Sequence, residues 1–108
     1  MQYTDPLPCL ANLWRSLRSG GTLLITVPAL GRIDAIAGDA DKWRWTPAGL
    51  RSLLDAAGME STGVQGYGNL IVCQAALLGL AVEDLSEAAI KALDPSFPLT
   101  VCARTDKP

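Results

Sequence analysis

The sequence predicts an α/β domain, because stretches with helical and with strand patterns alternate along its 108 residues. The main observation is the run TLLITVP at residues 22–28, which is continuously apolar and rich in β-branched residues. Such runs are typical of strands buried on both faces of a parallel sheet. The second observation is that residues 7–18 and 46–58, before and after this run, place leucines at helical spacing. The length allows one small domain.

The predicted first helix, residues 7–18, has leucines and a tryptophan at intervals of three and four residues, so one of its faces is apolar. Gly20-Gly21 ends it, and one of these glycines is expected to adopt the left-handed conformation. The predicted strand at 22–27 follows at once. Burial on both faces of this strand requires helices on both sides of the sheet.

A loop with one helical turn is predicted at residues 29–41, because glycines interrupt its pattern. Open α/β sheets bind ligands at loops in this position, after the carboxyl end of a buried strand. The second helix begins with Thr46 as N-cap and Pro47 at its first position, and Gly58 ends it. A weak strand is expected at 60–65, with bends or bulges at the glycines of GVQGYG.

The last third of the chain is predicted to contain two helices and a strand. Asn69 is a suitable N-cap for a helix over residues 70–80. This helix is apolar on nearly all sides, so we expect it to lie on the sheet or against a partner. Ser86 caps a short amphipathic helix that ends before an Asp-Pro pair. The final strand, 99–104, alternates apolar and polar residues.

The composition excludes several classes of function. A net charge of −2 gives no electrostatic basis for binding nucleic acid. The chain has no histidine, so it cannot by itself build a Ser-His-Asp or Cys-His site, and without a CxxC motif we expect no metal site. No apolar run is long enough to cross a membrane. Cys9, Cys73 and Cys102 are expected to be buried thiols of a cytoplasmic protein.

Five motifs resemble segments of class I S-adenosylmethionine-dependent methyltransferases, in particular the type 11 branch, and they occur in the same order. LANLWRSLRSGGTLLITVP is similar to the helix, glycine turn and fifth strand, with Ser19 in place of the usual proline. DKWRWTPAGLRSLLDAAGM is similar to the helix that precedes the sixth strand, and FPLTVCART to the seventh strand. Asp5-Pro6 matches the exit of the fourth strand, and YGN with LLGLA also resembles that branch.

The resemblance implies the C-terminal part of a Rossmann-like methyltransferase sheet: strands five to seven, mixed, with the last strand antiparallel between its neighbours. Residues 1–28, 29–68 and 69–108 would form successive parts of one partial domain. The implied activity is methyl transfer from S-adenosylmethionine to a small-molecule acceptor. The glycine-rich cofactor loop of the family has no counterpart, so we expect this chain to lack the cofactor half and to be inactive alone. Met1 would then be an internal or misassigned start, or the gene truncated.

The resemblance also indicates candidate site residues. Gln2 and Tyr3, at the exit of the fourth strand, would lie near the cofactor and the transferred methyl group, unless they belong to an unstructured terminus. Trp43 and Arg44 either line the acceptor pocket or pack as a structural anchor beside the N-cap of the second helix. A stacking platform for nucleic acid is disfavoured, because no basic patch accompanies them.

Other candidates leave two interpretations open. Tyr67 and Asn69 either contact the acceptor or serve only as turn and capping residues. Three aspartates form either an acidic rim for a basic acceptor or a solvated loop. They are Asp34, Asp39 and Asp41. No catalytic residue is identified. The alternative function is a non-catalytic subunit that self-associates through the exposed edge of the 22–27 strand and the 70–80 helix.

Overall fold

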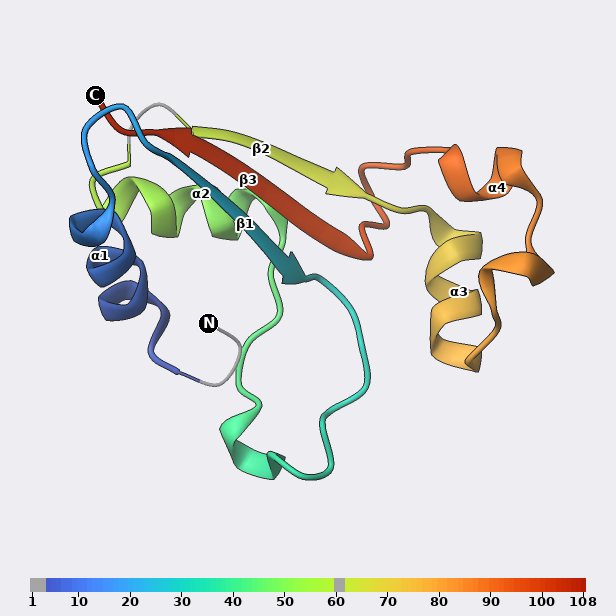
Figure 1. Cartoon of the computed structure of the whole chain (residues 1–108). Coiled ribbons are helices and arrows are strands. Elements are labelled where there is room, and N and C mark those ends of the chain that lie inside the picture. The colour runs from blue at the N-terminus through green and yellow to red at the C-terminus, as the bar shows by residue number, and fades with distance from the viewer. Residues whose placement is uncertain (1–3, 60–61) are drawn as a thin grey trace.

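The computed structural model describes residues 4–59 and 62–108, and their helices and strands follow the predicted order of an α/β domain (Figure 1). The elements are α1 (Pro6–Ser16), β1 (Thr22–Pro28), η1 (Gly38–Ala40), α2 (Pro47–Ala56), β2 (Thr62–Tyr67), α3 (Leu70–Leu78), η2 (Val82–Asp84), α4 (Glu87–Lys91) and β3 (Thr100–Asp106). The first residues of the strand predicted at 60–65 lie outside the described residues.

The last strand, β3, lies in the middle of the sheet and is antiparallel to both β1 and β2. Ile25 of β1 and Val64 of β2 pair with Ala103 from its two sides. The predicted place of the last strand between its neighbours is therefore confirmed. The predicted mixed sheet is corrected: β1 and β2 run in the same direction but are not neighbours, so both strand pairs in the described residues are antiparallel.

One face of the sheet builds the core together with α1 and α2, which lie along the same side of the strands (Figure 1). Alternate residues of a strand point to opposite faces, so every second residue of β1 and β3 reaches this core. The buried core residues are Leu10, Val27, Trp45, Leu50, Leu54, Met59, Val101 and Ala103.

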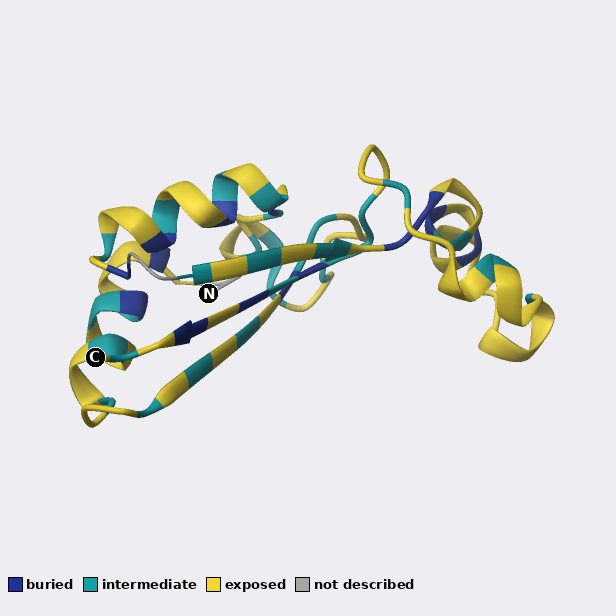
Figure 2. Ribbon diagram, turned by 90° about the horizontal axis from the view of Figure 1, so that it is seen from above, coloured by how far each residue is buried: buried dark blue, intermediate teal, exposed yellow. Residues whose placement is uncertain are grey.

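The opposite face of the sheet is exposed, which corrects the prediction that β1 is buried on both faces. Exposed residues alternate with more buried ones along the strands (Figure 2), and Leu24 in the middle of β1 is 73% exposed. The reason is the position of the helices. Both helices that contribute to the core of the sheet lie on one side of it, so the side chains that point the other way meet solvent.

The three predicted N-caps are confirmed. In each case the side-chain oxygen accepts a hydrogen bond from the backbone N–H three residues later, at 2.9–3.1 Å. These residues are Thr46 for α2, Asn69 for α3 and Ser86 for α4. Gly20 and Gly58 have φ angles of +79° and +88°, so the expected left-handed glycines after α1 and α2 are also present.

Helix α1 ends two residues earlier than predicted. Leu17 already has an extended backbone, with ψ of 129°. The side-chain amine of Lys107, next to the end of the chain, donates hydrogen bonds of 2.7 Å to the carbonyl oxygens of Trp14 and Leu17. These bonds satisfy carbonyl groups that the next turn of the helix would otherwise have used.

The glycines of β2 form no bulge, which corrects that part of the prediction. Its register with β3 is unbroken from Thr62 to Tyr67. A Cβ atom at Gly66 would come within 3.2 Å of side-chain carbons of Pro47 and Pro98, so this glycine allows two segments to pack closely over the strand.

Helix α3 does not lie on the sheet, which corrects one of the two predicted positions. It extends beyond the end of β2 and packs against α4 (Figure 1). The chain turns away from the sheet at Gly68, where φ is +137° and a Cβ atom would lie 2.7 Å from the backbone nitrogen of Leu99. Two chain segments, one through Gly68 and one through residues 94–99, therefore connect the α3–α4 unit to the sheet.

We predict that Leu54→Ala lowers the free energy of unfolding by about 2–5 kcal/mol, because Leu54 is fully buried between α2 and the sheet. The matched control is Leu24→Ala, the same substitution on the open face, which we expect to cost about 0.5 kcal/mol or less. Urea denaturation followed by tryptophan fluorescence measures both. Equal losses would contradict the one-sided core.

Candidate ligand-binding site

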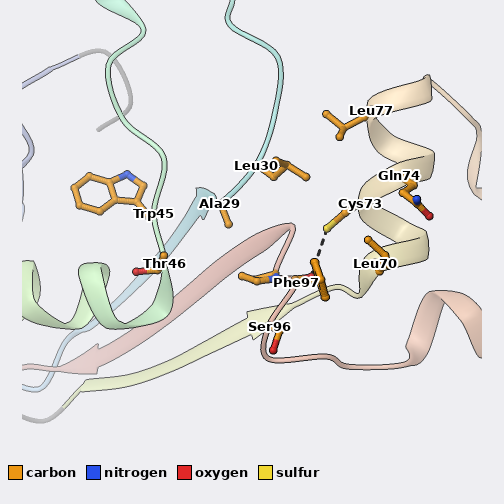
Figure 3. A pocket seen from close by; sticks show the side chains of 11 residues that line it. Ala29, Leu30, Trp45, Thr46, Leu70, Cys73, Gln74, Leu77, Ser96 and Phe97 are labelled. Atoms are coloured by element: carbon orange, nitrogen blue, oxygen red, sulfur yellow. Dashed lines mark hydrogen bonds between the residues drawn. The ribbon is translucent and has the colours of Figure 1, made fainter.

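A cavity of about 300 Å³ lies beside the carboxyl end of β1, between the start of α2 and α3 (Figure 3). Its walls are formed by Ala29 and Leu30, by Trp45 and Thr46, by one side of α3, and by the turn at residues 96–98. Four segments that are distant in the sequence therefore meet here. Part of the wall belongs to the 29–41 loop, where a ligand site was predicted.

The cavity is lined by apolar and neutral polar side chains, and no charged side chain lines it among the described residues. The Cys73 thiol donates a hydrogen bond of 3.4 Å to the carbonyl oxygen of Phe97 (Figure 3). Burial raises the pKa of Cys73, so the thiol stays protonated at neutral pH and is a poor nucleophile. This lining suits an apolar ligand that makes few polar contacts.

Trp45 belongs to both the core and the cavity. Its side chain is 8% exposed, it packs in the core cluster, and it also lines the cavity. Trp43 stacks on it, with ring centroids 5.8 Å apart, and donates a hydrogen bond of 3.1 Å to the carbonyl oxygen of Thr4. Trp43 does not line the cavity, so its described contacts are those of a structural anchor.

Arg44 holds the loop after β1 together rather than lining the cavity. Its guanidinium group donates two hydrogen bonds to the carboxylate of Asp41, at 2.7 and 3.0 Å, and two more to the backbone carbonyl oxygens of Arg32 and Trp43. The Asp41 side chain is fully buried and also accepts a hydrogen bond from the backbone N–H of Asp34. Arg44 therefore connects the two ends of the loop.

The three aspartates of this loop do not form one rim. Asp41 points inward to Arg44, and the carboxylate of Asp34 accepts hydrogen bonds from the backbone N–H groups of Ile36 and Ala37. Asp39 is exposed in η1. Two of the three carboxylates are thus used to shape the loop itself.

Tyr67 and Asn69 lie near the α3–α4 unit and outside the lining of the 300 Å³ cavity. The side-chain amide of Asn69 donates hydrogen bonds to the carbonyl oxygens of Ala89 and Ala92, at 2.7 and 2.8 Å, so it joins the start of α3 to α4. Tyr67 is half-exposed at the end of β2. Gln2 and Tyr3 lie outside the described residues.

Several residues of the cavity were not identified from the sequence. Leu30, Cys73 and Phe97 look like ordinary apolar residues, and only their meeting in space makes them a wall. The prediction that all three cysteines are buried holds for Cys73 and is wrong for Cys9 and Cys102, which are half-buried. The one usable signal was the position of Leu30, directly after the carboxyl end of a strand.

Comparisons of the chain with protein-family models, with curated proteins and with solved structures gave no match. Within residues 4–59 and 62–108, no group of three or more cysteine, aspartate or glutamate side chains is placed to hold a metal ion. No helix in the same part of the chain has the length and apolar composition needed to span a membrane.

We predict that Asp41→Asn lowers the free energy of unfolding by about 1–3 kcal/mol, because Arg44 then keeps a partly buried charge without its counter-ion. Hydrogen exchange of the 29–46 backbone should also become faster. The matched control is Asp39→Asn at an exposed position of the same loop, which should leave stability and exchange unchanged. Unchanged stability in Asp41→Asn would contradict the role assigned to the ion pair.

Proposed function

We propose that this chain forms the acceptor-binding part of a methyltransferase that uses S-adenosylmethionine, as its sequence resemblance implies. The arrangement of the strands carries the proposal. The resemblance required the last strand to lie antiparallel between two earlier strands, and β3 lies in this way between β1 and β2. This order requires a crossover of the last strand, which a simple sequence of hairpins would not produce.

The position of the cavity also supports the proposal. It lies at the carboxyl end of β1, which is the edge where open α/β sheets bind their ligands. Methyl transfer depends mainly on holding donor and acceptor in line, so a shaped apolar cavity can contribute much of the rate. Among the residues that the structure describes, no carboxylate or amine lines the cavity. The acceptor would therefore be one that needs no base from the cavity wall, such as a group that is already anionic.

The described residues do not fit the cofactor. Methyltransferases of this family hold S-adenosylmethionine with a glycine-rich loop and an acidic residue. In this chain, all residues but the last glycine of the segment GVQGYG belong to β2, in unbroken register with β3, so the segment does not form a loop that could cradle a phosphate or a nucleoside. We therefore assign the cofactor site to another polypeptide segment, which this chain would complete.

We predict that the purified 108-residue chain shows no saturable binding of labelled S-adenosylmethionine below about 1 mM in equilibrium dialysis. The protein made from the complete reading frame of the gene should bind it and transfer the labelled methyl group to an extractable small molecule. Tight binding by the 108-residue chain would contradict the division into two parts. No methyl transfer by the complete product, tested with a broad mixture of acceptors, would contradict the function.

A second candidate function is self-association, and the outer edge of β1 favours it. In the described part of the chain, β1 pairs with β3 on one side and with no strand on the other. None of its residues is charged, so the edge lacks the lysines that commonly prevent strand pairing. Leu24 adds an exposed apolar side chain at the centre of this edge strand.

This candidate predicts a defined dimer in sedimentation velocity. Leu24→Lys should weaken the dimer by about tenfold or more, because a charge on an edge strand opposes pairing. Gln65→Lys places the same charge on the exposed face of β2 and serves as the control. A monomer at all concentrations, or equal effects of the two substitutions, would contradict association through β1.

A further inference from the structure

A second cavity of about 370 Å³ adjoins the first one along α3. The two share Leu30 and Leu77 as lining residues, and in Figure 3 Leu77 points from α3 toward the chain that leaves β1. We call the two cavities together the trough. One of its walls is the segment of residues 29–32 and the other is α3.

The charge in the trough is confined to one end. The first cavity is lined only by apolar and neutral polar side chains among the described residues. Arg32 lines the second cavity and is the one charged residue in the described lining of either. It is exposed, and none of the ion pairs in the described part of the chain involves its guanidinium group.

These observations define the ligand by its charge and shape. A cationic ligand would meet the positive charge of Arg32, and a compact apolar ligand would leave one of the two cavities empty. An arginine side chain binds carboxylate, sulfate and phosphate groups through paired N–H donors. Hollows of a few hundred cubic ångströms are of the size that small molecules occupy, whereas a docking protein usually needs a broader surface.

We propose that the trough binds an elongated amphiphile, with its apolar body in the first cavity and a single anionic group beside Arg32. The role of this molecule as the methyl acceptor rests on the proposed function. Its binding does not, because it requires neither the cofactor nor the reaction. The inference therefore extends the proposed function by naming the chemical class of the acceptor.

The test uses decanoate as the probe, with decanol and decyltrimethylammonium as partners that share its chain and differ in charge. Isothermal titration calorimetry of the 108-residue chain should give a dissociation constant of about 0.1–1 mM for decanoate. Decanol should bind about fivefold more weakly, as expected for the loss of an ion pair at an exposed site. The cation should bind most weakly. Decyl sulfate and decyl phosphate identify the preferred anionic group.

Two pairs of variants locate the site. Arg32→Gln should remove the preference for decanoate over decanol, while Arg18→Gln, an exposed arginine after α1, should retain it. Leu77→Glu should weaken decanoate binding by about tenfold or more, because it places a carboxylate between the two cavities. Ile71→Glu is the control on the same helix. Both positions are more than half exposed, so both variants should fold, which circular dichroism verifies.

The results that overturn the proposal are clear for each measurement. Equal binding of decanoate and decanol, or no effect of Arg32→Gln, would show that the ligand needs no anionic group. No saturable binding of any probe at about 1 mM would show that the trough is not a binding site for such amphiphiles. Neither result depends on methyl transfer. Conversely, failure of the complete gene product to transfer methyl groups would leave a measured decanoate affinity intact.

Discussion

The position of β3 between β1 and β2 is the constraint on which the rest of the structure depends. In the described residues β1 and β2 do not pair with each other, and each pairs with the final strand while also packing against the helices. The pair Thr22 and Asp106 joins residues from nearly opposite ends of the chain, and their side chains form a hydrogen bond of 2.6 Å. Contacts between such distant residues require large loops to close, so forming this sheet carries a high cost in chain entropy.

The same arrangement explains why the fold and the cavity share residues. Val101 and Ala103 of β3 lie under the helices at the centre of the core, and Trp45 closes the core at the end where the cavity opens. Trp45 also anchors the loop after β1, since its backbone N–H donates a hydrogen bond of 2.9 Å to the carbonyl oxygen of Pro28. On this side the cavity wall is therefore formed in part by a core residue.

The sequence was most informative where the signal is local. Caps such as Thr46 and Asn69 depend on hydrogen bonds three residues apart, and both were identified correctly. The burial of β1 was predicted wrongly, because an apolar strand does not reveal whether one or two layers of helices cover it. One of the two positions predicted for α3, on the sheet, was also wrong. A helix that is apolar on all sides has no face that indicates its neighbour.

The candidate site was also predictable only where the signal is local. The loop after β1 was predicted as a ligand site from strand order alone, and Leu30 in that loop lines both cavities. The pairing of Arg44 with Asp41 was not anticipated, because either residue could also have faced a ligand. Cys73 and Phe97 reach the cavity only through the path of the chain after Gly68, for which the sequence carries no recognisable pattern.

Two chain segments connect the α3–α4 unit to the sheet. The two walls of the trough are therefore attached to the rest of the molecule in different ways. The wall of residues 29–32 belongs to the loop that Trp45 anchors to the core. The other wall, α3, packs mainly against α4 and lies beyond the end of the sheet. A molecule bound between them acts as a non-covalent cross-link. By bridging the two walls, it would stabilise the position of α3 and α4 relative to the sheet and would therefore favour local order in the C-terminal third of the chain.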